Sequence, residues 1–143
     1  MKEVIGMKEV LNAIQGALTV FGGILGWYLG GLDGFLHALI VFVALDYLTG
    51  VIVAIMEKKL SSEIGFKGIL KKVLIFVLVG IGNMVDVHLL KNGSAIRTAV
   101  IFFYLSNEGI SILENCSKAG LPIPDKLKAV LEQFNKAESS EGQ

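Results

Sequence analysis

Several apolar stretches of this sequence carry residues that could bind protons or ions. Asp46 lies in the middle of "LIVFVALDYLTGVIVAIM", which is otherwise nearly all apolar. A carboxylate in such a place is a neutral acid held by hydrogen bonds, an ionised group that lines water, or a proton-coupled site. A second group of polar residues recurs at helical spacing near the end of a later apolar stretch: Asn107, Glu108, Ser111, Glu114 and Asn115.

Residues for other kinds of chemistry are sparse. His37 and His88 are far apart and have no cysteine or carboxylate at metal-ligand spacing, and Cys116 is the single cysteine. These facts give little support to a metal site or to a histidine-based catalytic set, and they exclude an intramolecular disulfide. No phosphate-binding glycine motif is present. The sequence therefore predicts no enzyme, no metal and no cofactor.

The composition is that of a membrane protein. Hydrophobic residues make up 53% of the 143 residues and charged residues 18%, and the mean hydropathy is +0.66. Soluble domains average about 45–50% apolar and 25% charged residues. The net charge is zero, which argues against nucleic acid as a partner. The N-terminus lacks the features of a cleavable signal peptide, so we expect the first apolar block to be retained.

Four apolar blocks approach the roughly 20 residues that a helix needs to cross a bilayer. The sequence predicts an all-α, multi-pass membrane protein with spans at about 12–32, 35–56, 73–90 and 97–116. Basic residues prefer cytoplasmic loops. With both termini in the cytoplasm, only Lys91 and Arg97 among the basic residues lie outside. We therefore predict a transmembrane domain at 1–116, with N-in, C-in topology, and a cytoplasmic segment at 117–143.

The polar segments around these spans carry their own signals. In the loop at 57–72, apolar residues recur with the spacing of an amphipathic helix, which predicts an interfacial helix against anionic headgroups. In the tail, Gly120 and two prolines end the fourth helix, and "DKLKAVLEQF" predicts a short amphipathic helix followed by a disordered end. The membrane-surface basic residues of the loop are Lys58, Lys59, Lys67, Lys71 and Lys72.

Small residues predict where helices pack closely. The short "GLDG" turn predicts that the first two spans form an antiparallel hairpin. Gly22, Gly26 and Gly30 form a double G-x-x-x-G ridge on the first span, although glycine is also simply common in membrane helices. Asp46 repeats with Gly50 and Ala54 on one face of the second span, so we expect its carboxylate to face a packed helix.

Two further expectations concern charge. Asp46 and Glu108 fall near the midpoints of their spans, and no basic residue of the predicted spans lies at that depth to pair with them. Asp86 and Arg97 fall near the outer ends of the third and fourth spans, which predicts an ion pair there.

Several separated motifs together resemble the toxin secretion/phage lysis holin family. They are "DYLTG", "KKLSSEIGFKGILKK", the aspartate after the third block, "IRTAVIFFYLSNEGISILEN" and "GLPIPDKLKAVLEQF". The resemblance covers about two-thirds of the chain. It implies a protein of the bacterial cytoplasmic membrane that forms homo-oligomers and opens lesions, through which an endolysin or a toxin passes. The resemblance also implies that two start sites could give a longer inhibitor and a shorter effector; Met7 is then the candidate second start, and the alternative is a chance methionine.

Two alternatives remain at this stage. A small multidrug-type proton-coupled transporter also has four short spans and a membrane carboxylate, although that acid usually lies in the first span. An antiholin-like regulatory partner would keep the same packing faces without lysing the cell.

Overall fold

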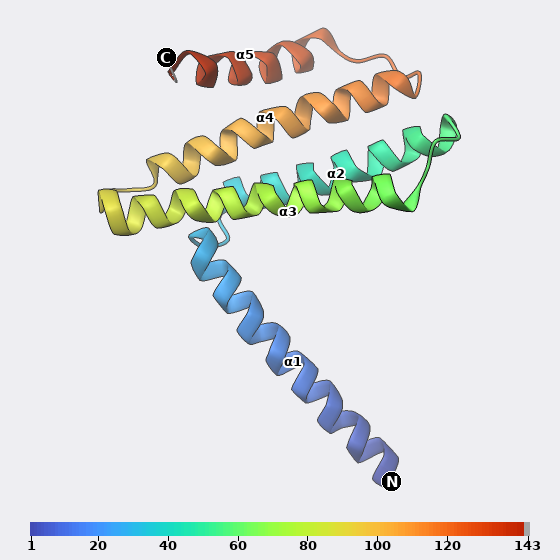
Figure 1. Ribbon diagram of the computed structural model, residues 1–143, viewed down its shortest axis with the longest axis vertical. Coiled ribbons are helices and arrows are strands. Elements are labelled where there is room, and N and C mark those ends of the chain that lie inside the picture. The colour runs from blue at the N-terminus through green and yellow to red at the C-terminus, as the bar shows by residue number, and fades with distance from the viewer. Residues whose placement is uncertain (142–143) are drawn as a thin grey trace.

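The computed structural model describes residues 1–141, which are entirely helical apart from short connections. The helices, shown in Figure 1, are α1 (Lys2–Leu29), α2 (Gly34–Met56), α3 (Ser62–Met84), the π-helical continuation η1 (Val85–Leu90), α4 (Ala95–Lys118) and α5 (Asp125–Glu141). Four helices are long and apolar enough to cross a membrane: α1, α2, α3 with η1, and α4. Within the described residues, the all-helical class and the presence of four helices able to span a membrane are confirmed, although the first and third begin earlier than predicted. The N-in, C-in orientation stays a prediction.

Side-chain caps fix where the second and third spans begin. The Asp33 carboxylate accepts the Leu36 backbone N–H at 2.9 Å, and the Ser61 hydroxyl accepts the Ile64 N–H at 3.2 Å. Such caps satisfy N–H groups that a helix start leaves without a partner. Ser61 is the cap and α3 begins at Ser62, so the loop after α2 is short. The basic segment that was predicted as a loop helix belongs to the same continuous helix as the third span. The prediction of a separate interfacial helix is therefore not confirmed.

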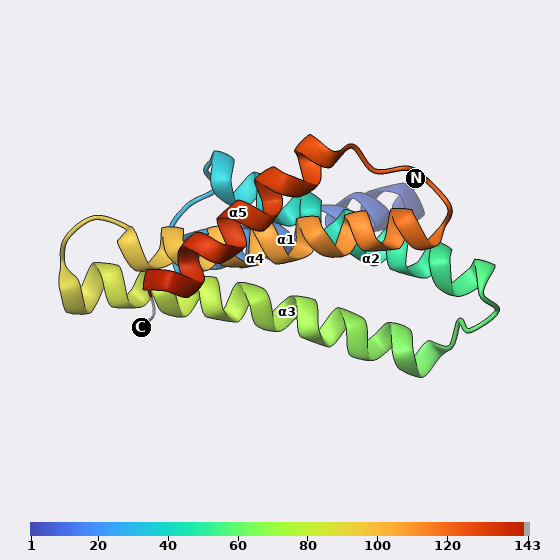
Figure 2. The ribbon, with the colours of Figure 1, turned by 90° about the horizontal axis from the view of Figure 1, so that it is seen from above.

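The core lies among α2, α3 and α4, which run alongside one another (Figures 1 and 2). Their outer surfaces are apolar and exposed, as a bilayer requires of a bundle that crosses it. The inner surfaces contribute a small cluster of buried side chains: Leu36, Leu39, Val43, Ile75, Val79 and Ile101.

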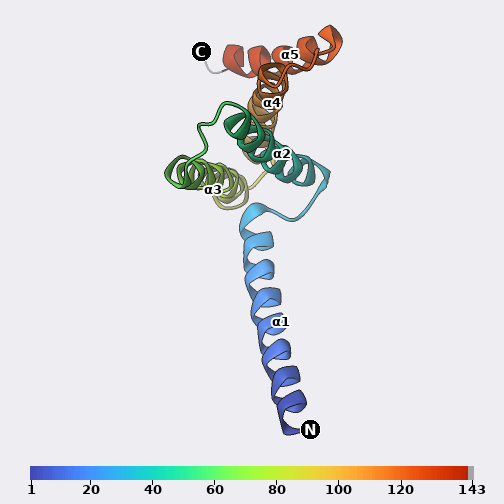
Figure 3. The same cartoon turned by 90° about the vertical axis from the view of Figure 1, so that its right-hand side faces the viewer.

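Helix α1 diverges from this bundle (Figures 1 and 3). It begins at Lys2 rather than at residue 12, has no buried residue, and contacts α3 but not α2. The predicted hairpin of the first two spans is therefore wrong. Its C-terminal end is held on α3 because the Tyr28 ring lies against Gly80, where any side chain would collide with it. The Tyr28 hydroxyl also donates to the Val77 carbonyl at 2.8 Å.

Helix α5 lies along α4 rather than free of the bundle (Figures 1 and 2). The turn between them includes Gly120, whose φ of +93° is in the left-handed region that favours glycine. Helix α5 continues to Glu141, into the end that composition predicts to be disordered. Residues 142–143 lie outside the described part of the chain.

Candidate functional site: a buried ionic cluster

Three ionisable side chains come from three different spans at one depth. Asp46 lies ten residues before the end of α2 at Met56, and Lys72 lies ten residues after the start of α3 at Ser62. Glu108 likewise lies ten residues before the end of α4 at Lys118. Ten residues of α-helix measure about 15 Å, half the thickness of the hydrocarbon core. The three helices thus bring their charges together near the predicted middle of the membrane.

Lys72 links the two acids. Its ammonium group donates to the carboxylate of Asp46 and to that of Glu108, and it forms an ion pair with each. Asp46 is 8% exposed and Glu108 is 7% exposed. The expectation that no basic residue lies at this depth is therefore wrong, as is the placing of Lys72 among the membrane-surface basic residues. With all three groups ionised, the cluster carries a net charge of −1.

An amide and a hydroxyl complete the cluster on the side of α2. The Asn115 side chain donates to the Asp46 carboxylate at 3.2 Å and to the Thr49 hydroxyl at 3.0 Å. Thr49 in turn donates to the Asp46 backbone carbonyl at 3.1 Å. Asp46 therefore has a charged partner on α3 and a neutral partner on α4. A buried carboxylate requires such hydrogen-bond partners.

The structure separates the polar residues predicted on the fourth span, which lie on α4. Glu108 and Asn115 join the cluster, and Ser111 lines a cavity beside it. Asn107 is only partly buried and Glu114 is exposed. Ser106 donates to the Phe103 carbonyl of its own helix and takes no part in the cluster.

A cavity of ≈ 310 Å³ connects the cluster with the loop between α2 and α3. Asp46 and Lys72 lie at its inner end, while Lys59 and Ser61 come from that loop. Since the loop is predicted to be cytoplasmic, the cavity gives water a path from the cytoplasm to the charges. Other residues that line it include Tyr47, Gly50, Ala54, Lys71, Ser111 and Asn115.

The predicted packing residues have different surroundings. A side chain at Gly22 or Gly26 would meet no atom within 4 Å, so the ridge on α1 is unoccupied along most of its length. Gly30 is packed, since a Cβ there would lie 2.7 Å from the Arg97 Nε atom. Gly50 faces α4, with the Asn115 amide nitrogen 3.7 Å from the corresponding point. Ala54 lines the cavity beside the cluster.

A second polar site joins the ends of the spans opposite the α2–α3 loop. The Arg97 guanidinium forms an ion pair with Asp33 at 2.6 Å and donates to the carbonyls of Leu29 and Gly31. Asp86 lies in η1 and is 1% exposed. It accepts the backbone N–H groups of Ile96 and Arg97, at 3.0 and 2.8 Å, at the start of α4.

The prediction that Asp86 forms an ion pair with Arg97 is therefore wrong, because the acidic partner of Arg97 is Asp33. Asp86 faces the helix start, where unpaired N–H groups and the helix dipole favour a negative charge. The guanidinium points instead to the α1–α2 turn. Its hydrogen bond with Asp33, in that turn outside the spans, lowers the pKa of the Asp33 carboxyl below its ordinary value.

The sequence contains a signal for the position of Lys72 deep in the third span. "SSE" before an apolar run is typical of a helix start, and a helix from Ser62 carries Lys72 three turns inward. Within the described residues, no group of three or more histidine, cysteine or acidic side chains is placed to hold a metal ion. The groups that form the cluster are two carboxylates, an ammonium group, an amide and a hydroxyl.

Comparison with known proteins identifies the class. The bacteriophage holin family matches residues 23–136, so the chain belongs to this family. Holin family membership makes it a multi-pass membrane protein and indicates a non-enzymatic role.

Individual relatives cover most of the chain. A protein of Clostridium perfringens described as "Uncharacterized 14.9 kDa protein in nagH 3'region" is 47% identical over 130 residues, which cover 90% of this chain and 98% of that protein. An uncharacterised protein of Listeria monocytogenes is 42% identical over 115 residues, covering 80% of this chain and 81% of the relative. A "Probable holin" of Bacillus phage phi105 is 37% identical over 97 residues, covering 68% of this chain and 71% of that protein. No solved structure matches.

Proposed function

We propose that this protein is a phage-type holin of the bacterial cytoplasmic membrane. It accumulates there, associates with copies of itself, and opens lesions that let an endolysin reach the cell wall; a toxin is the alternative passenger. The observation that supports this proposal most directly is the charged cluster of Asp46, Lys72 and Glu108 inside three spanning helices of a holin-family chain.

The cluster suits a protein that changes from a closed to a hydrated state. A charged residue at the centre of a spanning helix costs about 2.5–3.5 kcal/mol on insertion scales. In a single bundle, mutual pairing offsets this cost for Lys72 and its two acids. Water can replace the same contacts once helices separate, because every group in the cluster is polar or charged. The bundle is therefore stable while its helices are packed together, and its interior is ready to line an aqueous lesion.

Other polar residues of α4 supply more polar surface for the open state. Ser111 and Asn115 lie beside the cavity, and Glu114 is already exposed. Assembly of several copies would turn this surface and the cluster toward a common lumen. Apolar residues of the same helices would remain against lipid.

The test is induced expression in bacteria, with and without a cell-wall hydrolase that lacks a signal peptide. Turbidity reports lysis, and release of a large cytosolic enzyme reports the size of the lesion. Abrupt lysis after a delay, only when both proteins are present, is the expected result. Loss of ion gradients without enzyme release would contradict the proposal and would favour a small channel or the transporter alternative. Continued growth would favour the antiholin-like alternative.

Substitutions in the cluster connect the lysis to the site. Asp46→Leu and Glu108→Leu each remove one carboxylate and leave Lys72 paired with the other. The remaining pair is neutral, so both variants should reach the membrane at least as well as the unaltered protein. We expect them to delay or abolish lysis because the lumen loses a charge. Unchanged timing in both variants, at equal amounts in the membrane fraction, would remove the cluster from the mechanism.

A further inference from the structure

Two carboxyl groups of the ionic cluster share one cation. The single nitrogen atom of the Lys72 ammonium group donates to both Asp46 and Glu108, so the two carboxyl groups are neighbours. With all three groups ionised, their charges sum to −1. A net charge near the middle of a membrane is costly, and each of two adjacent carboxylates disfavours the ionised form of the other. One added proton would make the cluster neutral.

The hydrogen bonds indicate which of the two acids takes that proton. Asp46 accepts from Lys72 and also from the Asn115 amide, at 3.2 Å. Within the described residues, Lys72 is the one donor to Glu108. Hydrogen bonds to the ionised form favour it, so Asp46 is the better carboxylate of the two. A protonated Glu108 also gains a contact, because its O–H can donate to the Asp46 carboxylate, which lies within hydrogen-bond reach.

Other ionisable groups of α2, α3 and their loop leave this charge uncompensated. Lys59 and Lys71 line the same cavity as the cluster, but both are exposed, and Lys59 pairs with Glu57 at 3.7 Å. Water therefore screens their charges from the cluster. The Tyr47 hydroxyl, also in the cavity wall, donates to the Gly65 carbonyl at 3.5 Å.

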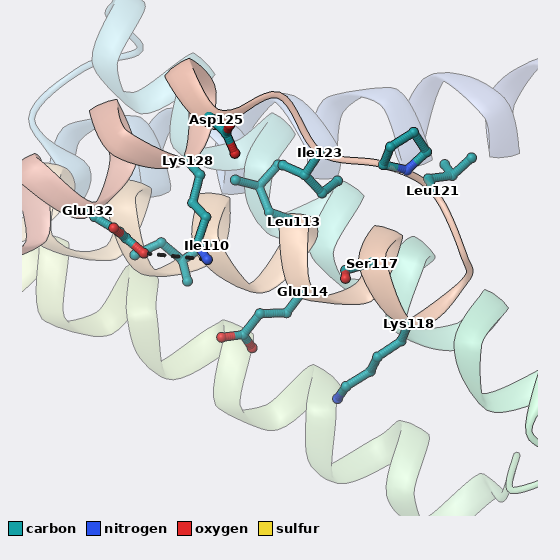
Figure 4. Close-up of a pocket in the computed structure, with 11 residues that line it drawn as sticks. Ile110, Leu113, Glu114, Ser117, Lys118, Leu121, Ile123, Asp125, Lys128 and Glu132 are labelled. Atoms are coloured by element: carbon teal, nitrogen blue, oxygen red, sulfur yellow. Dashed lines mark ion pairs between the residues drawn. The ribbon is translucent and has the colours of Figure 1, made fainter.

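The remaining helices bring no charge to the cluster in the part of the chain that the structure describes. Helix α5 packs on α4 beside the cluster through an apolar contact, between Leu131 and Gly109. Its Lys128 and Glu132 pair with each other at 4.0 Å beside another cavity, which Glu114 of α4 also lines (Figure 4). None of the three cluster residues lines that cavity. Helix α1 meets α3 by its C-terminal end, and its charged residues lie at its other end, at 2–9.

The cavity of ≈ 310 Å³ gives a proton a route to the cluster. It extends from Asp46 and Lys72 to Ser61 in the loop between α2 and α3. Ser111 and Asn115 line it as well, and they offer hydrogen-bond partners to water. Because this loop is predicted to be cytoplasmic, the cluster exchanges protons with the cytoplasm.

We propose that Glu108 is a proton-binding site. In the closed bundle its carboxyl group holds one proton taken from cytoplasmic water, and this O–H donates to the Asp46 carboxylate, while Asp46 and Lys72 stay ionised. The cluster is then neutral and each of its charges is paired. When the helices separate, Glu108 returns the proton to water and becomes an ionised group of the lumen. The proton site does not depend on the proposed function, whereas its release on opening rests on it.

Infrared spectroscopy of the full-length protein detects this proton directly. A protonated carboxyl group has a C=O stretching band that is separate from the bands of ionised carboxylates and backbone amides. The protein is measured at neutral pH in a mild detergent without carbonyl groups, since lipid esters absorb in the same region. We expect the band to be present, to shift when the side-chain carboxyl of glutamate carries a heavy carbon isotope, and to stay in place when aspartate carries it.

Three variants assign the band to the cluster. Glu108→Gln should abolish it, whereas Glu114→Gln, which changes an exposed acid of the same helix, should leave it unchanged. Asp46→Asn leaves Lys72 paired with Glu108 in a cluster that is neutral without an added proton. The band should therefore vanish in Asp46→Asn although Glu108 is intact, which a purely structural role of Glu108 does not predict. Circular dichroism checks that each variant keeps its helices.

Several results would overturn the proposal. Absence of the band from the unaltered protein would show that the closed cluster is charged. A band that shifts with labelled aspartate would place the proton on another acid, and a band that persists in Asp46→Asn would show that the charge of the cluster does not hold the proton.

The lysis assay keeps the two proposals distinct. Lysis by a protein without the band would mean that the holin function holds and that the proton site is wrong. The band in a protein that never permits lysis would support the proton site and contradict the proposed function.

Discussion

Removal of Lys72 is the most direct test of the ionic cluster. In Lys72→Met, a side chain of similar length replaces the ammonium group, and the carboxylates of Asp46 and Glu108 remain buried without their shared cation. Breaking a buried ion pair by removal of one partner costs about 3–5 kcal/mol. The lower end applies here because the Lys72 side chain is 18% exposed, so some water already reaches it.

A loss of about 3 kcal/mol corresponds to a change of about 150-fold in the unfolding equilibrium constant. Titration of the purified protein from mild detergent into a denaturing one, followed by circular dichroism, measures this change. Lys71→Met is the matched control because Lys71 adjoins Lys72 in the chain but is exposed. Its effect should stay within about 0.5 kcal/mol.

A compensated variant distinguishes charge from shape. Replacing Asp46 and Glu108 by leucine together with Lys72→Met removes every charge of the cluster at similar volume. Apolar replacement of a whole buried ion cluster is often neutral or stabilising, so we expect this triple variant to recover most of the lost stability. Equal stability of Lys72→Met and Lys71→Met, or a triple variant less stable than Lys72→Met, would refute the reasoning.

Three further changes address the ends of the helices. Gly80→Leu should free the end of α1 from α3, because any side chain at position 80 collides with the Tyr28 ring. The protease sensitivity of α1 in detergent should then rise, and the free energy of unfolding should fall by about 1–3 kcal/mol. Asp86→Asn should destabilise the protein by about 0.5–2 kcal/mol in thermal unfolding, because an amide offers one acceptor oxygen where the carboxylate accepts two N–H groups. Asp33→Asn should reduce stability at neutral pH and change its pH dependence. Because the folded pKa of Asp33 is lowered, its contribution is complete above the ordinary value of 3.8 and is lost as the pH falls through the folded pKa.

Each change has a control or a contradicting result. Gly23→Leu adds the same side chain where nothing lies within 4 Å, so it should leave α1 on α3. Ser94→Ala should have little effect, since Ser94 precedes α4 without forming a side-chain cap. For Asp33→Asn, a stability difference from the unaltered protein that stays constant from neutral pH to below the folded pKa would contradict the assigned ion pair.

Much of the fold could be predicted because the helices that cross a membrane are recognisable from short, local stretches of sequence. A span needs only enough consecutive apolar residues, so the four blocks predicted four helices correctly. The path of α1 depends instead on a distant contact, the Tyr28 ring on Gly80, which no local pattern reveals. A short turn predicted a hairpin because it limits the distance between helix ends, but it does not fix the angle between the helices.

The site was predicted in part for the same reason. Asp46 and Glu108 stood out because a carboxylate among aliphatic residues is costly wherever its partners lie. Lys72 did not stand out, because it follows Lys71 in a run that composition assigns to the membrane surface. A helix that starts at Ser62 places the two lysines 100° apart and turns one inward. The depth of Lys72 thus depended on the helix start, which the Ser61 cap marks, and its inward facing depended on the packing of α3 against α2 and α4.

The two polar sites differ in what holds them, and under the proposed holin function this difference predicts the order of the steps of opening. Near the α1–α2 turn, Arg97 and Asp86 bind several backbone groups, which remain fixed as long as the helices exist. In the central cluster, the contacts that join Lys72 to the other helices run only between side chains, and a cavity leads to them from the α2–α3 loop. Side-chain contacts can pass to water without any loss of helix, whereas the contacts of Arg97 and Asp86 cannot be released without leaving helix ends unpaired. Separation of α2, α3 and α4 is therefore easier from the predicted cytoplasmic side, with the opposite ends as the pivot.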